Sequence, residues 1–129
     1  MENSLQISTK QKILIIDDDE TLCKVIGEEL EQENYFATCS FSGKEGLTKL
    51  KLEKYNLVIL DYQMPEMDGY EVLQEIRIIY PSLPVMIITA NTETDTINKF
   101  ATSGVSDIVN KPFEFEDLLA RIKICLLKT

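Results

Sequence analysis

Polar side chains follow four short apolar segments of the chain, each at the point where the segment ends. The segments are uninterrupted and rich in β-branched residues, which is typical of strands buried on both faces. Because the carboxyl ends of parallel strands meet at one edge of a sheet, we expect these side chains to lie together. They are Asp17, Asp18 and Asp19 after residues 13–16, Asp61 after residues 57–60, Thr89 at the end of residues 85–89, and Lys111 after residues 108–110.

A cluster of carboxylates of this kind needs a cation. Two carboxylates about 4 Å apart repel each other by roughly 4 kcal/mol at an effective dielectric constant of about 20. Oxygen ligands without an imidazole or a thiolate select a hard ion, and a site with few protein ligands suits Mg²⁺, which keeps water ligands and shares phosphate oxygens. Asp17, Asp18 and Asp19 alone fit solvated helix caps equally well, but the polar residues at three other strand ends favour a shared site.

Amphipathic segments separate these strands and complete an alternating pattern. The remaining strand is predicted at residues 35–40. Five strands alternating with five helices predict an α/β fold, in which a parallel sheet is covered by helices on both faces as a three-layer sandwich. The helices are predicted at about residues 20–33, from the capping-box motif at residues 42–45 onward, at residues 72–79, at about residues 92–102, and from residue 115 onward.

Apolar side chains at helical spacing indicate which helix faces enter the core. Val25 belongs to the apolar stripe of the first helix and Ile79 to that of the third. The fourth helix is rich in Thr and Asn, and its apolar anchors are Ile97, Phe100 and Ala101. Its weak helix propensity makes it the element most expected to move.

Length and composition exclude several classes of protein. The 129 residues fit one domain, and the net charge of −9 disfavours binding to nucleic acid or to an anionic membrane. The absence of histidine excludes Ser-His-Asp and Cys-His nucleophile pairs, the usual zinc sites and a phosphohistidine. Cys23, Cys39 and Cys125 form no CxxC motif and are expected to be reduced, buried small hydrophobes of a soluble cytoplasmic protein. Residues 1–11 form a polar tail without a signal-peptide pattern, and the chain has no run long enough to span a membrane.

Four motifs occur in a fixed order along the chain: ILIIDDDE at residues 13–20, LVILDYQMPEMDGYEVL at 57–73, VMIITA at 85–90 and NKPF at 110–113. Together they resemble the receiver domain of bacterial two-component response regulators, over about residues 12–126. The resemblance implies a flavodoxin-like, doubly wound fold with strand order 2-1-3-4-5. It also implies that residues 12–129 form the receiver domain, preceded by the tail at residues 1–11.

The resemblance assigns a role to each acid of the expected site. Asp61 is the phosphoacceptor, whose carboxylate forms an acyl phosphate. Asp18, Asp61 and the backbone carbonyl of Gln63 bind Mg²⁺ directly, with Mn²⁺ as a possible substitute, and Asp17 holds the ion through water. Asp19 is expected only to begin a helix.

The same resemblance places two further groups on the phosphoryl oxygens. The Lys111 ammonium contacts one oxygen and the Thr89 hydroxyl donates to another. The Lys111–Pro112 peptide bond is expected to be cis, which aims the ammonium into the site. Gly69 fits a tight turn after Asp68 and is given a structural role only.

The function that follows is a switch rather than an ordinary enzyme: a phosphoacceptor that promotes its own phosphorylation and dephosphorylation. The expected partners are a histidine kinase or a phosphohistidine transfer protein and a downstream protein target. We expect a single-domain regulator of the chemotaxis or sporulation-relay type, as a monomer or a weak homodimer. Ile124 and Leu127 widen the apolar stripe of the last helix and fit either a dimer face or the start of a linker. The alternatives are the N-terminal receiver of a longer, for example DNA-binding, regulator and a degenerate receiver that acts only as an interaction module.

Two other function classes share parts of the pattern and fit less well. A flavodoxin-type electron carrier needs a phosphate cradle after the first strand, where Asp17, Asp18 and Asp19 would repel the phosphate. An aspartyl-nucleophile phosphatase typically needs a second Asp two residues after the nucleophile, and Gln63 stands there.

One position departs from the family's pattern. Receivers usually carry an aromatic residue three positions before the lysine, and this chain has Ile108. Either switching runs through backbone shifts and the fourth helix, or output through the fifth strand and its flanking helices is altered. Both readings stay open. Gln63 and Asn91, at positions that tune acyl-phosphate hydrolysis, are neutral amides and predict no particular rate.

Overall fold

A computed structural model of the chain describes residues 10–127 and shows one five-stranded parallel sheet. The strand order is β2-β1-β3-β4-β5, so the expected order is confirmed. The strands are β1 (Lys12–Ile16), β2 (Phe36–Ser40), β3 (Leu57–Asp61), β4 (Val85–Thr89) and β5 (Asp107–Asn110).

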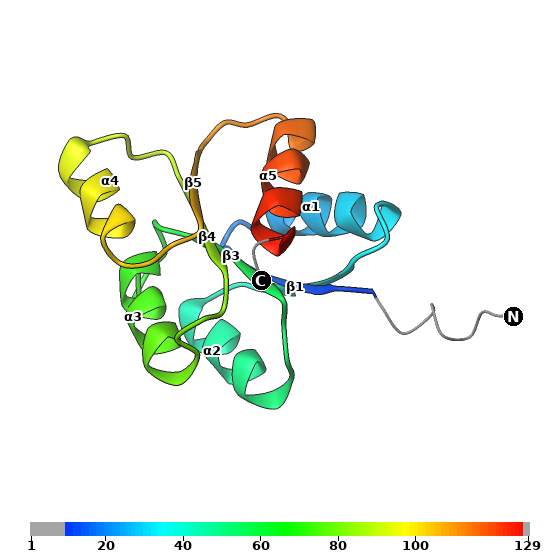
Figure 1. Ribbon diagram of the computed structural model, residues 1–129, viewed down its shortest axis with the longest axis horizontal. Helices are drawn as coiled ribbons and strands as arrows, with labels where there is room; N and C mark the ends of the chain where they lie inside the picture. The colour runs from blue at the N-terminus through cyan, green and yellow to red at the C-terminus, as the bar shows by residue number, and fades with distance from the viewer. Residues whose placement is uncertain (1–9, 128–129) are drawn as a thin grey trace, which may run out of the picture.

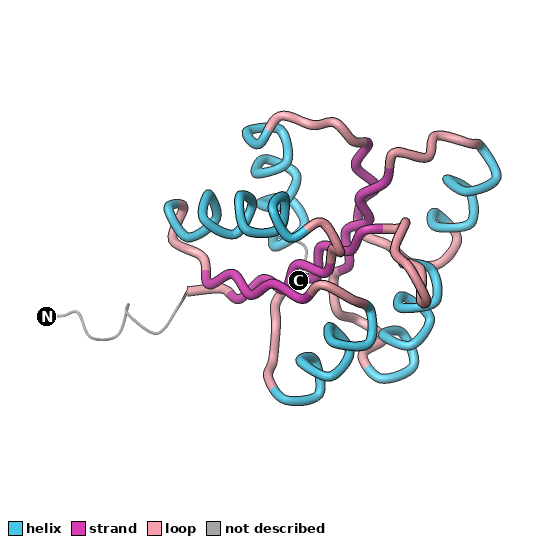
Figure 2. Tube along the Cα trace, turned by 180° about the vertical axis from the view of Figure 1, so that it is seen from behind, coloured by secondary structure: helices cyan, strands magenta, loops and turns pink. Residues whose placement is uncertain are grey.

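Five helices cover the two faces of the sheet, as the alternating pattern predicts. α1 and α5 lie on one side and α2, α3 and α4 on the other, which Figures 1 and 2 show from opposite directions. The helices are α1 (Glu20–Gln32), α2 (Gly43–Leu52), α3 (Gly69–Ile79), α4 (Thr94–Ala101) and α5 (Phe115–Leu127).

The apolar strands divide their side chains between two cores. Successive side chains of a strand point to opposite faces. Ile13 and Ile15 therefore pack with α1 and α5, whereas Leu14 and Ile16 pack with α2 and α3. Both faces are covered, so β1 and β3 read as continuous apolar runs rather than as alternating patterns.

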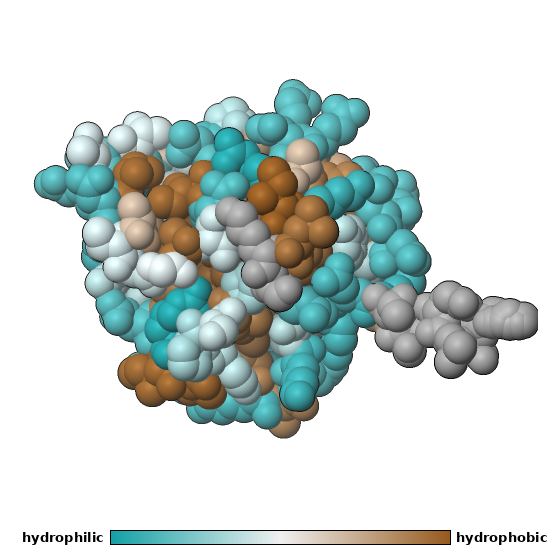
Figure 3. Space-filling model, in the orientation of Figure 1, coloured by the Kyte–Doolittle hydropathy of each residue, from teal (hydrophilic) through white to brown (hydrophobic). Residues whose placement is uncertain are grey.

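Some expected core positions lie at the surface. Val25 is 50% exposed and Ile79 is 41% exposed, because the buried stripes of α1 and α3 are narrower than their apolar sequences suggest. Apolar residues gather at the lower left of Figure 3, over α3 as labelled in Figure 1, and the exposed Ile78 and Ile79 belong to this helix. Cys23 and Cys125 are buried as expected, but Cys39 is only partly buried because β2 is an edge strand.

α4 is shorter than expected and has one buried anchor. It begins at Thr94, and its N-cap residue Glu93 makes no side-chain capping bond. Phe100 is fully buried, whereas Ile97 is partly buried and Ala101 is exposed. The helix is therefore held to the domain mainly through one aromatic ring.

Side-chain hydrogen bonds cap the N-termini of α1, α2 and α3. Asp19 accepts a hydrogen bond from the Leu22 amide at 3.0 Å and so begins α1, as expected. Ser42 caps α2 by accepting from the Glu45 amide, but the Glu45 carboxylate bonds the Phe41 amide, so the expected capping box is only half formed. A complete capping box, which was not predicted from the sequence, begins α3.

That complete box joins Asp68 and Glu71 and fixes the start of α3. Each carboxylate accepts from the other residue's amide at 3.0 Å. Asp68→Ala is therefore expected to lower the free energy of unfolding by about 1–2 kcal/mol, as measured by urea denaturation. Glu75→Ala, on the exposed side of the same helix, serves as the control. Equal stability of the two variants would show that the box does not hold the helix start.

The predicted tail falls mostly outside the described part of the chain, since residues 1–9 are not described. Gln11, its last residue, already joins the sheet edge by accepting a hydrogen bond from the Phe36 amide at 2.9 Å. The boundary between tail and domain stays a prediction. Within residues 10–127, no helix combines the length and the apolar composition needed to cross a bilayer.

Candidate functional site

Three carboxylates meet at the carboxyl edge of the sheet. Asp17, Asp18 and Asp61 each offer an oxygen, and these oxygens lie within 4.8 Å of one another. The cause is strand pairing: Ile16 of β1 stands opposite Leu60 of β3, so the next residue of each strand is an aspartate. Asp17 and Asp61 are buried, with 2% and 4% of their surface exposed, and Asp18 is exposed.

The Lys111 ammonium bridges the two buried carboxylates. Its Nζ lies 3.3 Å from Asp17 Oδ2 and 3.2 Å from Asp61 Oδ1. The Lys111 amide donates to the Thr89 carbonyl at 2.9 Å, which holds the lysine beside the end of β4. The following peptide bond to Pro112 is cis, as the resemblance implies.

Without a metal ion, the cluster holds more negative charge than the Lys111 ammonium can offset. Burial and the neighbouring charge of Asp17 raise the pKa of Asp61 from 3.8 to about 6; the positive charge of Lys111 opposes the shift and Asp18 adds to it. Burial on its own would lower the pKa of Lys111, but Asp17 and Asp61 outweigh burial and raise it above its ordinary value. Lys111 contacts only two of the three clustered carboxylates, and this arrangement is consistent with a divalent metal site.

Stability without a divalent cation is expected to fall as the pH rises from about 4 to about 7. The native pKa of Asp61, about 6, exceeds its ordinary value of 3.8, so the proton stabilises the native state and its contribution is lost as pH rises through the native pKa. The shift corresponds to up to about 3 kcal/mol. In EDTA near neutral pH, Asp61→Asn should therefore unfold at a higher urea concentration than the wild type, and the difference should vanish near pH 4.

The control for this effect is Asp117→Asn, which removes an acid exposed on α5. It is expected to leave the pH dependence unchanged. If Asp61→Asn unfolds at a lower urea concentration than the wild type at neutral pH in EDTA, the charge of Asp61 is not destabilising.

Backbone contacts hold Asp17 in place. Its Oδ1 accepts from the Asp19 amide at 2.9 Å, and its own amide donates to the Ser40 carbonyl at 3.0 Å. This contact with Ser40 was not predicted from the sequence, because it uses a backbone carbonyl and does not depend on the residue type.

Thr89 ends the strand beside β3, and Gln63 follows Asp61 in the chain. Thr89 is fully buried, and its Oγ1 accepts a hydrogen bond from the Asn91 amide at 2.8 Å. Asp61 stands opposite Ile88, one residue before Thr89. Gln63 lies two residues beyond Asp61 in the β3–α3 loop, with an exposed side chain.

Gly69 packs against the backbone of Asp61 and Tyr62. A Cβ at this position would stand 2.5 Å from the Asp61 carbonyl oxygen and 2.8 Å from the Tyr62 Cα. Its amide donates to the Tyr62 carbonyl at 2.8 Å, at the first residue of α3. The expected reason for a glycine, a tight turn, is wrong: what excludes a side chain here is the close approach of two backbone segments.

Ile108 lies on the face of the sheet that carries α2, α3 and α4, where it is partly buried. Aromatic rings occur elsewhere on this face. Tyr62 and Tyr70 both pack edge-on against Phe100, with ring centroids 5.1 and 5.9 Å apart. These rings join the residue after Asp61 to α4.

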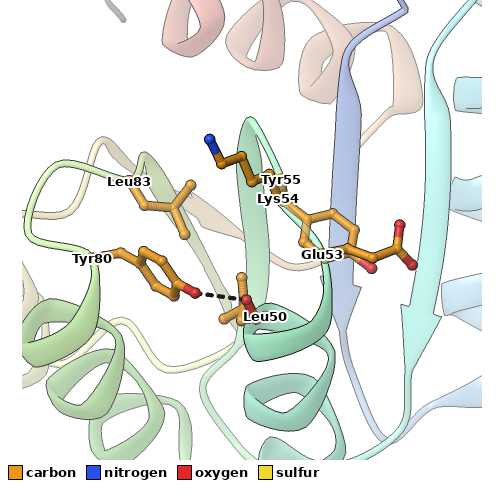
Figure 4. Close-up of a pocket in the computed structure, with 6 residues that line it drawn as sticks. All are labelled: Leu50, Glu53, Lys54, Tyr55, Tyr80 and Leu83. Atoms are coloured by element: carbon orange, nitrogen blue, oxygen red, sulfur yellow. Dashed lines mark hydrogen bonds between the residues drawn. The ribbon is translucent and has the colours of Figure 1, made fainter.

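Two hollows lie at opposite ends of the strands, one at their amino ends and one at their carboxyl ends. One, of about 190 Å³, is shown in Figure 4, where the Tyr80 hydroxyl donates to the Leu50 carbonyl at 2.8 Å. Its lining comes from the segments before β3 and β4, so it lies away from the carboxylates. The other, of about 350 Å³, opens beside Lys111 and is lined also by Leu22, Ala90, Pro112 and Phe113.

Comparison with known proteins agrees with this geometry. The family described as "Response regulator receiver domain" matches residues 13–123, and the chain belongs to this family. Receiver domains are phosphoacceptor modules of two-component signalling, which work with histidine kinases and carry an acidic pocket for phosphorylation.

Curated relatives include two longer bacterial regulators. The chain is 38% identical over 115 residues to the transcriptional regulatory protein CrdR of Helicobacter pylori, covering 88% of this chain and 54% of that protein. It is 41% identical over 117 residues to the response regulator ArlR of Staphylococcus saprophyticus, covering 89% and 52% respectively. The chain thus spans about half the length of the curated relatives it matches.

Solved structures of receivers superpose closely on the chain. The CheY-like receiver domain protein of Methanospirillum hungatei gives a TM-score of 0.89 at 28% identity, covering 93% of this chain and 96% of that one. The BeF3-activated DrrB receiver domain gives a TM-score of 0.84 at 31% identity, covering 92% and 99%.

Proposed function

We propose that Asp61 accepts a phosphoryl group from a phosphohistidine donor and that the acyl phosphate switches the domain's contacts with other proteins. The observation that carries this proposal is the Lys111 ammonium, which lies within 3.3 Å of both buried carboxylates. A carboxylate attacks phosphorus only where negative charge is offset and the reacting groups are aligned. The degenerate-receiver alternative lacks support because Asp18, Asp61 and Lys111 are all in place.

The transfer needs one bond to form and one to break. An Asp61 carboxylate oxygen attacks phosphorus, the P–N bond to the donor imidazole breaks, and the leaving nitrogen keeps the bonding pair and takes up a proton. Lys111 offsets charge on the phosphoryl oxygens. The Thr89 oxygen accepts from Asn91, so its own O–H remains available to donate to a phosphoryl oxygen. The hollow beside Lys111 leaves room for the donor's approach.

The acidic cluster fits Mg²⁺, and Mn²⁺ as a substitute. Asp18, Asp61 and the Gln63 carbonyl would hold the ion directly, and Asp17 would hold it through water. The donors support this choice because they are hard oxygens without imidazole or thiolate. When bound, the ion neutralises carboxylate charge and polarises phosphoryl oxygens.

Intact-protein mass measurement after incubation with acetyl phosphate and Mg²⁺ tests the proposal. The wild type is expected to gain one phosphoryl group, and the gain should be absent in Asp61→Asn and in EDTA. Asp117→Asn, which removes an exposed acid of α5, should be labelled like the wild type. A gain of the same size in Asp61→Asn would overturn the assignment.

The upstream partner in this proposal is a histidine kinase or a phosphohistidine transfer protein. The phosphorylated domain acts through protein contacts, as a monomer or weak homodimer, and does not itself bind nucleic acid. A second candidate is the receiver of a longer regulator of transcription, which the match to about half of CrdR supports. Binding of the phosphorylated chain to a separate target protein would favour the single-domain reading.

A further inference from the structure

Two cysteine side chains meet between α1 and β2. Cys39 Sγ lies 3.2 Å from the Cys23 carbonyl oxygen, and Cys23 Sγ lies 3.7 Å from the Ile15 carbonyl oxygen. Ile15 is also the strand partner of Cys39 in the β1–β2 pairing. The two thiols therefore lie on the same side of the sheet, against the same turn of α1.

A glycine of α1 also lies beside Cys39. Gly27 follows Cys23 by one helical turn and so lies on the same face of α1. A Cβ at Gly27 would stand 3.7 Å from Cys39 Sγ, an ordinary contact distance, so Cys39 packs against this turn of α1. Burial, and after it the neighbouring Cys39 thiol, raises the pKa of Cys23.

We propose that Cys23 and Cys39 are a redox-active pair, which a hydroperoxide converts into an intramolecular disulfide joining α1 to β2. Formation of this disulfide does not require phosphorylation of Asp61. It would give Cys23 and Cys39 a chemical role beyond that of small buried hydrophobes.

The reaction proceeds in two balanced steps. The Cys39 thiolate attacks the peroxide oxygen, breaks the O–O bond and becomes a sulfenic acid, while the peroxide leaves as an alcohol or water. The Cys23 thiol then attacks the Cys39 sulfur, forms the S–S bond and releases water. Two thiols have lost two electrons and two protons, and one hydroperoxide has been reduced.

Exposure decides which thiol reacts first. Cys39 is partly exposed on the edge strand, whereas Cys23 is fully buried with its pKa raised chiefly by that burial. A buried thiol with a raised pKa is a poor first nucleophile, but one already beside a sulfenic acid needs no access to solvent. Cys125, which is buried on α5, is the third thiol and supplies an internal control.

Treating the whole native chain with hydrogen peroxide tests the proposal, with unreduced peptides mapped by mass spectrometry. We expect a loss of two hydrogen atoms and one linked peptide pair that contains Cys23 and Cys39. Cys125→Ser should form the same link. Cys39→Ser, a mild change at a partly exposed site, should form none, and a reducing agent should restore the wild-type mass.

Oxidation in concentrated urea tests whether the native fold, and not random collision of thiols, determines which cysteines pair. The unfolded chain is expected to give a mixture of the three possible pairings, whereas the native chain gives one. The same mixture from both states would overturn the proposal. Accumulation of sulfinic acid on Cys39 without a link to Cys23, or a link between two chains through Cys39, would overturn it as well.

Discussion

Lys111→Met is expected to slow phosphorylation of Asp61 by acetyl phosphate by about 100- to 1,000-fold, the range found when one charge-stabilising donor is removed. The ammonium is the group that faces both buried carboxylates, at 3.3 Å from Asp17 and 3.2 Å from Asp61. Methionine has a similar length and carries no charge, so the variant removes the charge with little loss of packing. The rate is measured by the time course of the mass gain at fixed Mg²⁺.

The same variant should be less stable in EDTA. Removing Lys111 leaves two buried carboxylates facing each other, and we expect a loss of about 1–3 kcal/mol in the free energy of unfolding. Lys123→Met, at an exposed position on α5, is the matched control and should change neither quantity. A Lys111→Met protein that is labelled at the wild-type rate would show that the lysine does not act on the phosphoryl group.

Gly69→Ala is expected to lower the free energy of unfolding by about 1–3 kcal/mol, in the range for overpacking a tight contact. The added Cβ would stand 2.5 Å from the Asp61 carbonyl oxygen, which belongs to the backbone and cannot rotate away. The β3–α3 connection must therefore shift, and Asp61 shifts with it. Because a displacement of about 1 Å can cost roughly 100-fold in rate, labelling should slow by ten-fold or more.

Gly27→Ala provides the comparison for Gly69→Ala. Its Cβ would make only ordinary contacts, the shortest at 3.7 Å, inside helix α1. Alanine is favoured over glycine inside a helix by about 0.5–1 kcal/mol, so this variant should be as stable as the wild type or more stable. If Gly69→Ala behaves like Gly27→Ala, the close approach behind Asp61 is not a constraint on the site.

The fold was predictable because three of its strands, β1, β3 and β4, are buried on both faces. Runs such as Leu57–Leu60 identify strands directly, and the helices between them require parallel pairing. Exposure of particular helix residues was less predictable. Val25 and Ile79 have the spacing of buried residues, but how much of a helix face is covered depends on its neighbours, which the helix's own sequence does not contain.

The site was predictable to the extent that strand ends determine it. Asp17 and Asp61 follow paired positions of neighbouring strands, so their proximity follows from topology. The approach of Gly69 to the Asp61 backbone and the contact between Cys23 and Cys39 depend on how a loop and a helix settle on the sheet. Residue spacing carries no signal for such contacts.

Borohydride trapping tests most directly whether Asp61 is the acceptor. Borohydride reduces an aspartyl phosphate to homoserine, and peptide sequencing then identifies the residue that carried the phosphoryl group. After incubation with acetyl phosphate and Mg²⁺, we expect homoserine at position 61 and unchanged aspartate at Asp17 and Asp18. Homoserine at either of those two positions, or a phosphorylated chain that yields none at position 61, would contradict the account.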